Sequence, residues 1–411
     1  MRILFLSHYF PPEINAPASR TYEHCKVWAA AGHKVTVVTC FPNHPAGIIY
    51  PPYRNRLWQR EERDGIDVIR LLTYATANEG FVKRTANYVL YLIMVVLFVW
   101  RLPKADAVVS TSPQFFCGLA GYLVSRVKRA PWVLEIRDLW PESILAVGAI
   151  KNRRIIAALE WLERFAYAKA ARIVSVTDSF VPHIEARGGA GKTEVVKNGA
   201  DLSLFKPQPR DDAFARQLGV EGKFVAAYVG THGMAHGLDS LLEAARLLRD
   251  DARFAFVMAG GGAERARLVE KRDALGLDNV IMLEQMAKED MPRLWSICDA
   301  SLVLLRDLPL FTSVIPSKIF ESMAMGVPIL LGVRGESAAI IEAAGCGKAI
   351  PPENPEVLAE ALRAMVDDLA LCTRWREAGQ AYVREHFDRA VLAMRFLRIV
   401  KEAHKSHEAG R

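Results

Sequence analysis

The chain has 411 residues, of which 51% are hydrophobic and 24% charged, and its formal net charge is +7. This composition excludes a disordered chain and supplies enough apolar residues for two domains of ordinary size, while the positive charge suits an anionic ligand or membrane surface. No zinc-finger spacing, RNP-like aromatic motif or basic tract indicates nucleic acid as a partner, and six scattered cysteines without a C-x-x-C pair argue against a disulfide scaffold or a zinc site.

The first apolar segment opens the chain and predicts a short buried strand. In "MRILFLSHYFPPE" the apolar run breaks at His8 and again at Pro11 and Pro12. It is therefore too short for a secretory signal peptide, and we expect a cytoplasmic protein.

Further strand-like segments alternate with helical patterns along the chain. Those of the first half are "RILFLS", "KVTVVTC", "IDVIRL", "DAVVST", "WVLEI" and "RIVSVT". After "TEVVKNGADLSLFKPQP" the alternation restarts with "KFVAAYVG", "RFAFVMAG", "VIMLEQ", "ASLVLL" and "PILLGV". Apolar strands that alternate with helices indicate parallel sheets covered on both faces. There are too many strands for one sheet.

The restart divides the chain, and segment 206–222, rich in Pro, Asp and Gln, is the natural boundary. We predict an α/β protein with two Rossmann-like domains at residues 1–202 and 203–385. A C-terminal helix at 386–411 is expected to pack back on the first domain. Ligands of such folds bind beyond the carboxyl ends of the strands, which predicts a site in a cleft between two facing sheets.

One segment of the first half, "YVLYLIMVVLFVW" at residues 88–100, is apolar on every side and has basic residues on both flanks. As a helix it would be about 20 Å long, which is short of the ~30 Å hydrocarbon core of a bilayer. Two interpretations stay open: a fully buried core helix, or a helix over 86–101 that lies in a membrane interface. In the second case, changing Leu92, Val95 and Val99 to Ser should release the protein from liposomes.

Glycine-bearing loops follow two strands of the second half. "THGMAHGLDSLLEAARLL" opens an amphipathic helix, so Gly230 and Gly233 can let the backbone approach a phosphate beside a helix N-terminus. "GGAERARL" repeats the arrangement at Gly260 and Gly261, but Arg265 occupies the third glycine position of the dinucleotide fingerprint. Neither loop is a P-loop. Each is weak evidence alone; together they favour a phosphate-bearing ligand.

A third helix start lies in "PSKIFESMAMGVP", residues 316–328, where Lys318 and Glu321 share the first turn. Glu321 cannot complete a capping box with Ser317, because Phe320 is the residue three positions after it. A surface ion pair, worth about 0.2–0.5 kcal/mol, fits poorly beside buried strands. A lysine and helix-start N–H groups can hold a diphosphate, and a carboxylate one turn later can accept hydrogen bonds from both ribose hydroxyls. The pair favours a nucleotide ligand.

Taken together, these segments resemble the retaining, GT-B-fold glycosyltransferases of the group 1 family (glycosyltransferase family 4). The matching segments follow family order and spacing over essentially the whole length: "VVKNGADLSLFKP", "YVGTHGMAHGLDSLLEAARLL", "VMAGGG", "NVIMLEQMAKEDMPRLWSICDASLVLL" and "PSKIFESMAMGVPIL". "YFPPEINAPASR", "EIRDLWPES" and "PLFTSVIPSK" are similar to a subgroup that makes bacterial surface polysaccharides such as O-antigen and capsule, including N-acetylfucosamine transferases.

The resemblance implies a donor site in the second domain. Glu321 would bind the nucleotide ribose, Lys318 the diphosphate with help from Arg306, and the loop at Met286 the uracil. The other residues implied on the donor side are Gly230, Thr231, Gly233, His236, Gly260, Gly261, Ser313 and Ser317.

It also implies an acceptor side in the first domain, at Asn15, Ala16, Arg137 and Asp138. With Lys318 and Glu321, Asp138 is our candidate catalytic residue, to position or deprotonate the acceptor hydroxyl. A role for Asp138 as a cap of the helix that starts near Pro141 stays open.

The chain departs from the family pattern at several positions. Many members carry Glu-x7-Glu, whose first position here is Ser313, so what holds the hydroxyls of the transferred sugar is an open question. Many members also have Arg and Lys in the phosphate loop, where this chain has Thr231 and His236. His236 is either a phosphate donor or an ordinary loop histidine. The first loop, often Gly-Gly, is the stiffer "NAPA" at 15–18.

The resemblance therefore implies a retaining transferase that moves a sugar, such as an N-acetylated amino or deoxyamino sugar, from a UDP-sugar to a polyprenyl-diphosphate-linked or saccharide acceptor. It would work at the inner leaflet of the membrane, without a metal or other cofactor, since the chain has no D-x-D. Two alternatives stay open: a nucleotide-sugar epimerase of the same fold, and a non-catalytic nucleotide-sugar or lipid-binding protein, for which Ser313 would mark lost catalysis.

Overall fold

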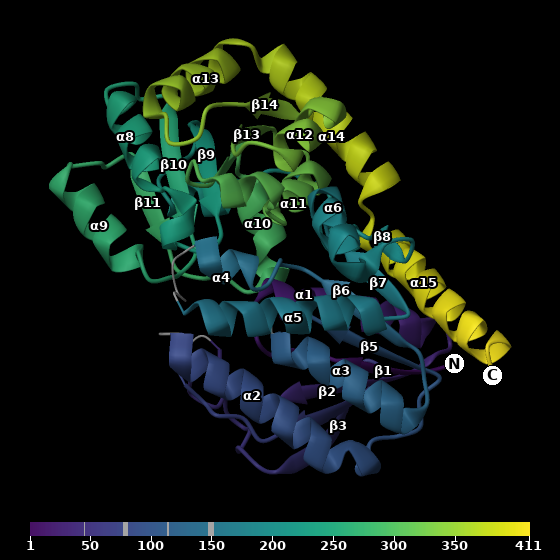
Figure 1. The fold of residues 1–411 in the computed structure, drawn as a ribbon. Helices are drawn as coiled ribbons and strands as arrows, with labels where there is room; N and C mark the ends of the chain where they lie inside the picture. The colour runs from purple at the N-terminus through teal and green to yellow at the C-terminus, as the bar shows by residue number, and fades with distance from the viewer. Residues whose placement is uncertain (45, 77–80, 113–114, 147–151) are drawn as a thin grey trace. The chain divides into compact units, whose positions relative to one another are not determined.

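The chain forms two compact units, each an α/β domain with a largely parallel sheet (Figure 1). The computed structural model describes residues 1–44, 46–76, 81–112, 115–146 and 152–411. The first unit is Met1–Lys197 with Arg389–Arg411, and the second is Asn198–Asp388. The prediction of two Rossmann-like domains is confirmed. The structure places the division a few residues before position 203, and the C-terminal segment belongs to the first unit.

The sheet of the first unit has the order β3-β4-β2-β1-β5-β6-β7-β8. Only β3, at one edge, is antiparallel to its neighbour. The order reverses between β1 and β5, so the loop after β1 lies at the topological switch point, where ligands of such folds bind. The strands are β1 (Arg2–Leu6), β2 (Lys34–Cys40), β3 (Trp58–Arg63), β4 (Ile66–Leu71), β5 (Ala107–Thr111), β6 (Trp132–Ile136), β7 (Arg172–Ser175) and β8 (Thr193–Val195).

Helices cover both faces of this sheet, because neighbouring side chains of a strand point to opposite sides. Phe5 of β1 packs on Trp28 of one helix, and Trp28 contacts Phe396 of another, whereas Leu4 and Leu6 face a different core. Thus α1 and α15 cover one face and α2, α3 and α5 the other. The helices are α1 (Ala16–Ala30), α2 (Phe81–Phe98), α3 (Phe115–Lys128), α4 (Glu142–Ala146), α5 (Arg153–Lys169), α6 (Val181–Ile184) and α15 (Arg389–Ala409).

The second unit has a fully parallel sheet with the order β11-β10-β9-β12-β13-β14. The order reverses between β9 and β12, which is again a switch point. The strands are β9 (Phe224–Val229), β10 (Phe254–Ala259), β11 (Val280–Leu283), β12 (Ala300–Leu304), β13 (Ile329–Gly332) and β14 (Gly347–Ala349).

On one face of this sheet α8 and α13 enclose a core around Phe256 and Leu302. On the other face α11 packs against β12, where Ser322 donates a hydrogen bond to Ser301 at 2.7 Å. The helices of this unit are α7 (Asp212–Gln217), α8 (Asp239–Leu247), α9 (Arg265–Ala274), α10 (Met291–Ser296), α11 (Lys318–Met325), α12 (Glu336–Ala344), α13 (Pro355–Asp367) and α14 (Leu369–His386).

Helix α2 corrects one of the two expectations for the segment 88–100. Tyr91, Met94 and Val95 are buried in the core of the first unit, while Leu97 and Trp100 are exposed by 66% and 79%. The helix therefore has one buried side and one exposed side that is also apolar, so the interpretation of a fully buried core helix is wrong. Among the described residues, no helix is both long and apolar enough to cross a membrane.

The residues chosen from sequence for the outer face of α2 were also wrong. Val95 is fully buried and Val99, in the 3₁₀ turn η1 (Val99–Arg101), is 5% exposed; Leu92 is partly buried. A stretch that is apolar on every side carries no periodicity, so its sequence does not indicate which side faces the sheet.

Candidate functional site

The loops after β9 and β10 meet at the switch point of the second unit. The N–H of Gly230 donates to the carbonyl of Ala259 at 2.9 Å. Gly260 has a φ of +144°, and a Cβ added there would lie 1.9 Å from the carbonyl oxygen of Gly230. Only glycine allows this contact. The strand–glycine–helix pattern thus brings two backbone loops together at the carboxyl edge of the sheet.

Lys318, the first residue of α11, turns its ammonium toward the first of these loops. Its Nζ lies 3.6 Å from the ring centroid of Tyr228, and a Cβ on Gly230 would be 3.0 Å from it. The Nζ is buried and has no hydrogen-bond partner among the described residues. Burial lowers the pKa of Lys318 to about 7, and Glu321 acts in the opposite direction. A buried cation that lies on a ring and has no hydrogen-bond partner among the described residues is suited to an anionic ligand.

Tyr228 is a site residue that the sequence analysis missed. It is fully buried, its ring carries the Lys318 ammonium, and its hydroxyl donates to the carbonyl of Thr231 at 2.7 Å. It therefore links the lysine to the loop. Its position near the end of β9, two residues before Gly230, could have identified it from the sequence.

Two histidines of the loop also surround Tyr228. The ring centroids of His232 and His236 both lie 5.9 Å from that of Tyr228. Burial, followed by nearby cations that include Lys318, lowers the pKa of each histidine to about 4. His232 was missed by sequence reasoning and is fully buried. Both imidazoles are thus neutral near pH 7, which leaves Lys318 as the group that titrates there.

The remaining donor residues implied by the resemblance lie at the same edge of the sheet or near it. Ser317 precedes α11 without a side-chain capping bond. The hydroxyl of Ser313 donates to the carbonyl of Leu310 at 3.1 Å, within the 3₁₀ turn η6 (Pro309–Ser313). Met286 follows β11 and is partly exposed, and Gly261 follows β10. Ser313 thus uses its hydroxyl locally.

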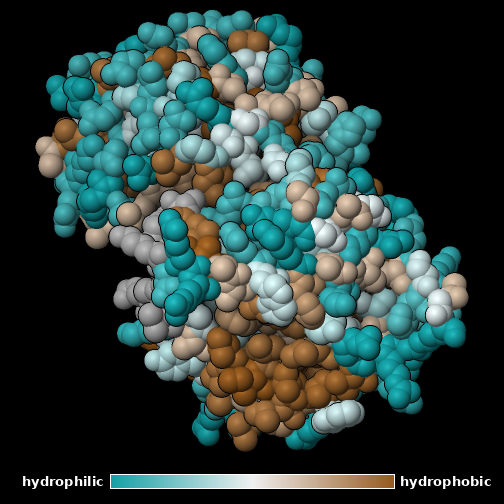
Figure 2. Space-filling view, viewed as in Figure 1, coloured by the Kyte–Doolittle hydropathy of each residue, from teal (hydrophilic) through white to brown (hydrophobic). Residues whose placement is uncertain are grey.

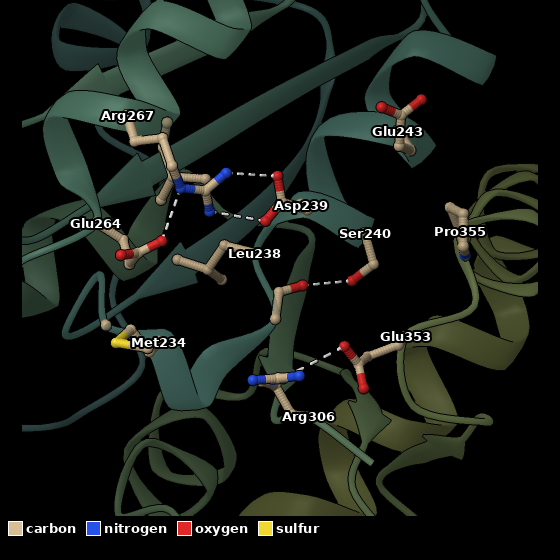
Figure 3. Close-up of a pocket in the computed structure, with 13 residues that line it drawn as sticks. Met234, Leu238, Asp239, Ser240, Glu243, Glu264, Arg267, Arg306, Glu353 and Pro355 are labelled. Atoms are coloured by element: carbon tan, nitrogen blue, oxygen red, sulfur yellow. Dashed lines mark hydrogen bonds and ion pairs between the residues drawn. The ribbon is translucent and has the colours of Figure 1, made fainter.

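Arg306 lines a pocket to which Lys318 does not contribute (Figure 3). This pocket has a volume of about 410 Å³; Gly233 and Arg306 line it, whereas Lys318 and Glu321 do not. Arg306 faces Glu353 at 3.7 Å. On the opposite wall Arg267 pairs with Asp239 and Glu264, each at 2.7 Å. The arginines here already have acidic partners, in contrast to Lys318.

In the first unit, charged residues gather where β6 ends. Arg20 of α1 donates to Glu135 at 2.8 Å and to the carbonyls of Val196 and Lys197. Burial favours a higher pKa for Glu135, but Arg20 and Arg137 outweigh it, so its pKa lies below the ordinary value. This Arg20–Glu135 pair joins α1 to β6 and was not predicted.

The predicted acceptor residues divide into two kinds. Asn15 accepts a hydrogen bond from the N–H of Ala18 at 2.9 Å as the N-cap of α1, and Ala16 is the first residue of that helix. Arg137 has Nε and Nη1 buried without a partner among the described residues, and burial lowers its pKa to about 10. Burial raises the pKa of Asp138 to about 6. Asn15 thus caps α1, although its Nδ2 is also buried without a partner among the described residues, whereas Arg137 and Asp138 combine burial with shifted pKa values.

Comparison with known proteins covers both units. Residues 15–199 match the family model described as a glycosyl transferase 4-like domain, and residues 209–382 match that of glycosyl transferases group 1. The colanic acid biosynthesis glycosyl transferase WcaI of Escherichia coli K12 is 23% identical over 413 residues, which cover 98% of this chain and 100% of WcaI.

Solved structures share the fold at low identity. Sucrose-phosphate synthase of Thermosynechococcus elongatus matches with a TM-score of 0.79 at 18% identity, covering 99% of this chain and 100% of that one. HepE of Anabaena in complex with UDP-glucose matches with a TM-score of 0.73 at 19% identity, covering 98% and 100%. These likenesses concern the fold alone, a chain of two Rossmann-like domains.

Proposed function

Because the chain belongs to the group 1 glycosyltransferases and has the GT-B fold, we propose that it transfers a sugar from a UDP-sugar to an acceptor hydroxyl with retention of configuration. The observation that carries the proposal is the Lys318 ammonium, held between Tyr228 and Gly230 without a hydrogen-bond partner among the described residues. A diphosphate supplies the anion that this cation and the adjacent glycine loops can bind.

In the proposed reaction the bond between the sugar C1 and the diphosphate oxygen breaks, and a bond between C1 and the acceptor oxygen forms on the same face. The acceptor proton passes to an oxygen of the leaving diphosphate. Lys318 and the N–H groups at the start of α11 stabilise the negative charge that develops on that group. Glu321 accepts hydrogen bonds from the ribose hydroxyls. This division of roles needs no metal ion and no other cofactor.

UDP is the proposed nucleotide because the fold-related HepE is described with UDP-glucose. His236 replaces the lysine that many relatives carry in the phosphate loop, and its neutral imidazole donates one hydrogen bond to phosphate. Thr231 is exposed next to it. The transferred sugar is proposed to be an N-acetylated amino or deoxyamino sugar, on the subgroup resemblance alone.

The acceptor is proposed to be a polyprenyl-diphosphate-linked saccharide in surface polysaccharide synthesis. WcaI, named for colanic acid biosynthesis, supports the polysaccharide. Arg137, with unpartnered N–H groups, supports an anionic acceptor, and Asp138 would orient the attacking hydroxyl. A lipid-linked acceptor requires peripheral association with the inner leaflet, for which α2 is the candidate.

The test is nucleotide release from a panel of UDP- and GDP-sugars, with and without lipid-linked acceptors extracted from membranes. Acceptor-dependent release of one nucleotide, lost in Glu321→Ala, would support a transferase and identify its donor. Conversion of the sugar without release of nucleotide would indicate an epimerase. Tight UDP binding without either reaction would indicate a binding protein. Ser313, in place of the Glu that many members carry, would then reflect the loss of catalysis.

A further inference from the structure

Large apolar side chains gather on the outer surface of α2 and its neighbour α3. Figure 2 shows a continuous hydrophobic area where Figure 1 draws these two helices. We call this surface the α2–α3 face, and its exposed residues are Ile93 (47%), Val96 (43%), Leu97 (66%), Trp100 (79%) and Leu123 (41%). Single exposed apolar residues are ordinary, but a contiguous group of this kind marks an interaction surface.

The face is not part of the folded core. The inward side of α2 already fills the core with Tyr91, Met94 and Val95, and α3 does so with Cys117 and Val124. The outward residues therefore add little to the stability of the unit. Their exposure in water is a cost that only a partner surface removes.

The stretch of chain that carries this face is basic in sequence. Between residues 81 and 130 the sequence has one acidic residue, Asp106, which pairs with Arg2. The exposed basic residues of the same stretch are Lys83, Arg101, Lys104, Arg126 and Arg129. Lys128 donates a hydrogen bond to the carbonyl of Leu102 at 2.6 Å. Exposed Arg101 lies over the ring of Trp58 at 5.1 Å, and within the described part of the chain it forms no ion pair, nor do Lys104 and Arg126.

We propose that the α2–α3 face docks on an anionic lipid bilayer, with Leu97 and Trp100 inserted among the acyl chains and the basic rim on lipid phosphates. The proposal deepens the membrane association proposed above and rests on the lipid-linked acceptor. An apolar patch with an exposed tryptophan and a basic rim is the composition of an interfacial anchor. A second copy of the chain fits poorly, because a two-fold contact through this face would bring two basic rims together.

Sedimentation of the full-length protein with vesicles tests the proposal. The wild type should sediment with phosphatidylcholine vesicles that contain phosphatidylglycerol, and added salt should weaken this binding. Leu97→Ser with Trp100→Ser should weaken it about tenfold or more, because two large side chains no longer bury apolar area. Lys104→Glu with Arg126→Glu should weaken it about tenfold on anionic vesicles and have little effect on phosphatidylcholine alone.

The matched control is Val391→Ser with Met394→Ser on α15, which covers the opposite face of the sheet. These residues are exposed by 60% and 44%, so the control removes exposed apolar groups from the same unit. It should bind vesicles as the wild type does. Because all substituted residues are exposed, unfolding temperatures should stay unchanged, which separates lost docking from lost folding.

Two outcomes would overturn the proposal. One is equal vesicle binding by Leu97→Ser/Trp100→Ser and the wild type. The other is a wild type that binds neither kind of vesicle. If light scattering then finds a dimer that Leu97→Ser/Trp100→Ser dissociates, the occupant of the face is a second copy of the chain. A wild type that binds anionic vesicles but releases no nucleotide from any donor would refute the proposed function and leave the docking intact.

Discussion

Both sheets reverse their strand order beside their first strand, and both carry charged side chains at the carboxyl edge near that reversal. In the second unit, Lys318 lies on the ring of Tyr228 with no hydrogen-bond partner among the described residues. In the first unit, Arg20 and Glu135 neutralise one another at 2.8 Å, and the titrating group close by is a carboxyl, Asp138.

The difference separates structural charge from functional charge. A buried pair such as Arg20–Glu135 balances its two charges and fixes a helix on a strand, although Oε2 of Glu135 has no hydrogen-bond partner among the described residues. Burial without such a partner disfavours the charged form of a group and therefore shifts its pKa. Groups with strongly shifted pKa values cluster at functional sites. In the proposed reaction, the second unit would offer a cation to the leaving diphosphate, and the first a carboxyl to the acceptor hydroxyl.

The largest expected effect comes from removing the cation. Lys318→Met should lower kcat/KM by about 10²–10³-fold, because the developing charge on the diphosphate loses its donor. Since the native site disfavours the charged lysine, the unfolding temperature should be unchanged or higher. Lys348→Met, at an exposed lysine of the same unit, is the control. If Lys318→Met keeps the kcat/KM of the wild type, Lys318 has no role in the mechanism.

The ionisation of Asp138 should determine how kcat falls at acidic pH, which is the acid limb of the pH profile of kcat. Its folded pKa of about 6 lies above the ordinary value, so the active carboxylate is lost as the pH falls through 6. We expect kcat to fall about tenfold per pH unit below 6, and Asp138→Asn to lower it about 10²-fold and abolish that limb. Glu142→Gln, close to Asp138 and at the start of α4, should keep the limb. An unchanged limb in Asp138→Asn would assign it to another group.

The sequence predicted the central strands because they are apolar on both sides, whereas it did not predict β3, β8 and β14. All three lie at sheet edges and are partly exposed, so they lack the continuous apolar run of a buried parallel strand. The outward side of α2 was missed for the opposite reason, because an entirely apolar stretch has no polar face to identify.

The site was predicted only where its residues are close in sequence. Gly230 and the Lys318–Glu321 turn each form a local pattern. Tyr228 lies on Lys318 across 90 positions of the chain, and Arg20 meets Glu135 across 115. Such contacts depend on the order of strands in the sheet, which a single sequence does not specify.

Tyr228 should matter through its ring rather than its hydroxyl. A cation–π contact with a desolvated ammonium is worth about 2 kcal/mol, so Tyr228→Leu should raise the KM for donor roughly tenfold to thirtyfold. Tyr228→Phe keeps the ring and loses the hydrogen bond to Thr231, which predicts a change of about fivefold, near 1 kcal/mol. Initial-rate kinetics at varied donor concentration compare them. An equal rise of the KM for donor in both variants would assign the effect to the hydroxyl of Tyr228. The contrast between the two units would then not depend on the cation–π contact.

The smallest effect is the pH dependence of donor binding. Free Lys318 has a pKa of about 7, and a bound diphosphate should raise it by favouring the charged form. Below pH 7 the lysine already carries its proton. Above pH 7 binding must take one up, so affinity should fall by several-fold at pH 8 and approach tenfold per unit beyond. His236, with a pKa of about 4, stays neutral throughout this range.

Calorimetric titration of the UDP-sugar without acceptor, in buffers of different ionisation enthalpy, measures this proton directly. The sugar-linked diphosphate keeps a constant charge in this range, so the proton belongs to the protein. Uptake should approach one proton at pH 8 and disappear in Lys318→Met. Uptake that persists in that variant would place the titrating group elsewhere, and Lys318 would then be a charged ligand at all pH values rather than a cation that completes its charge when the donor binds.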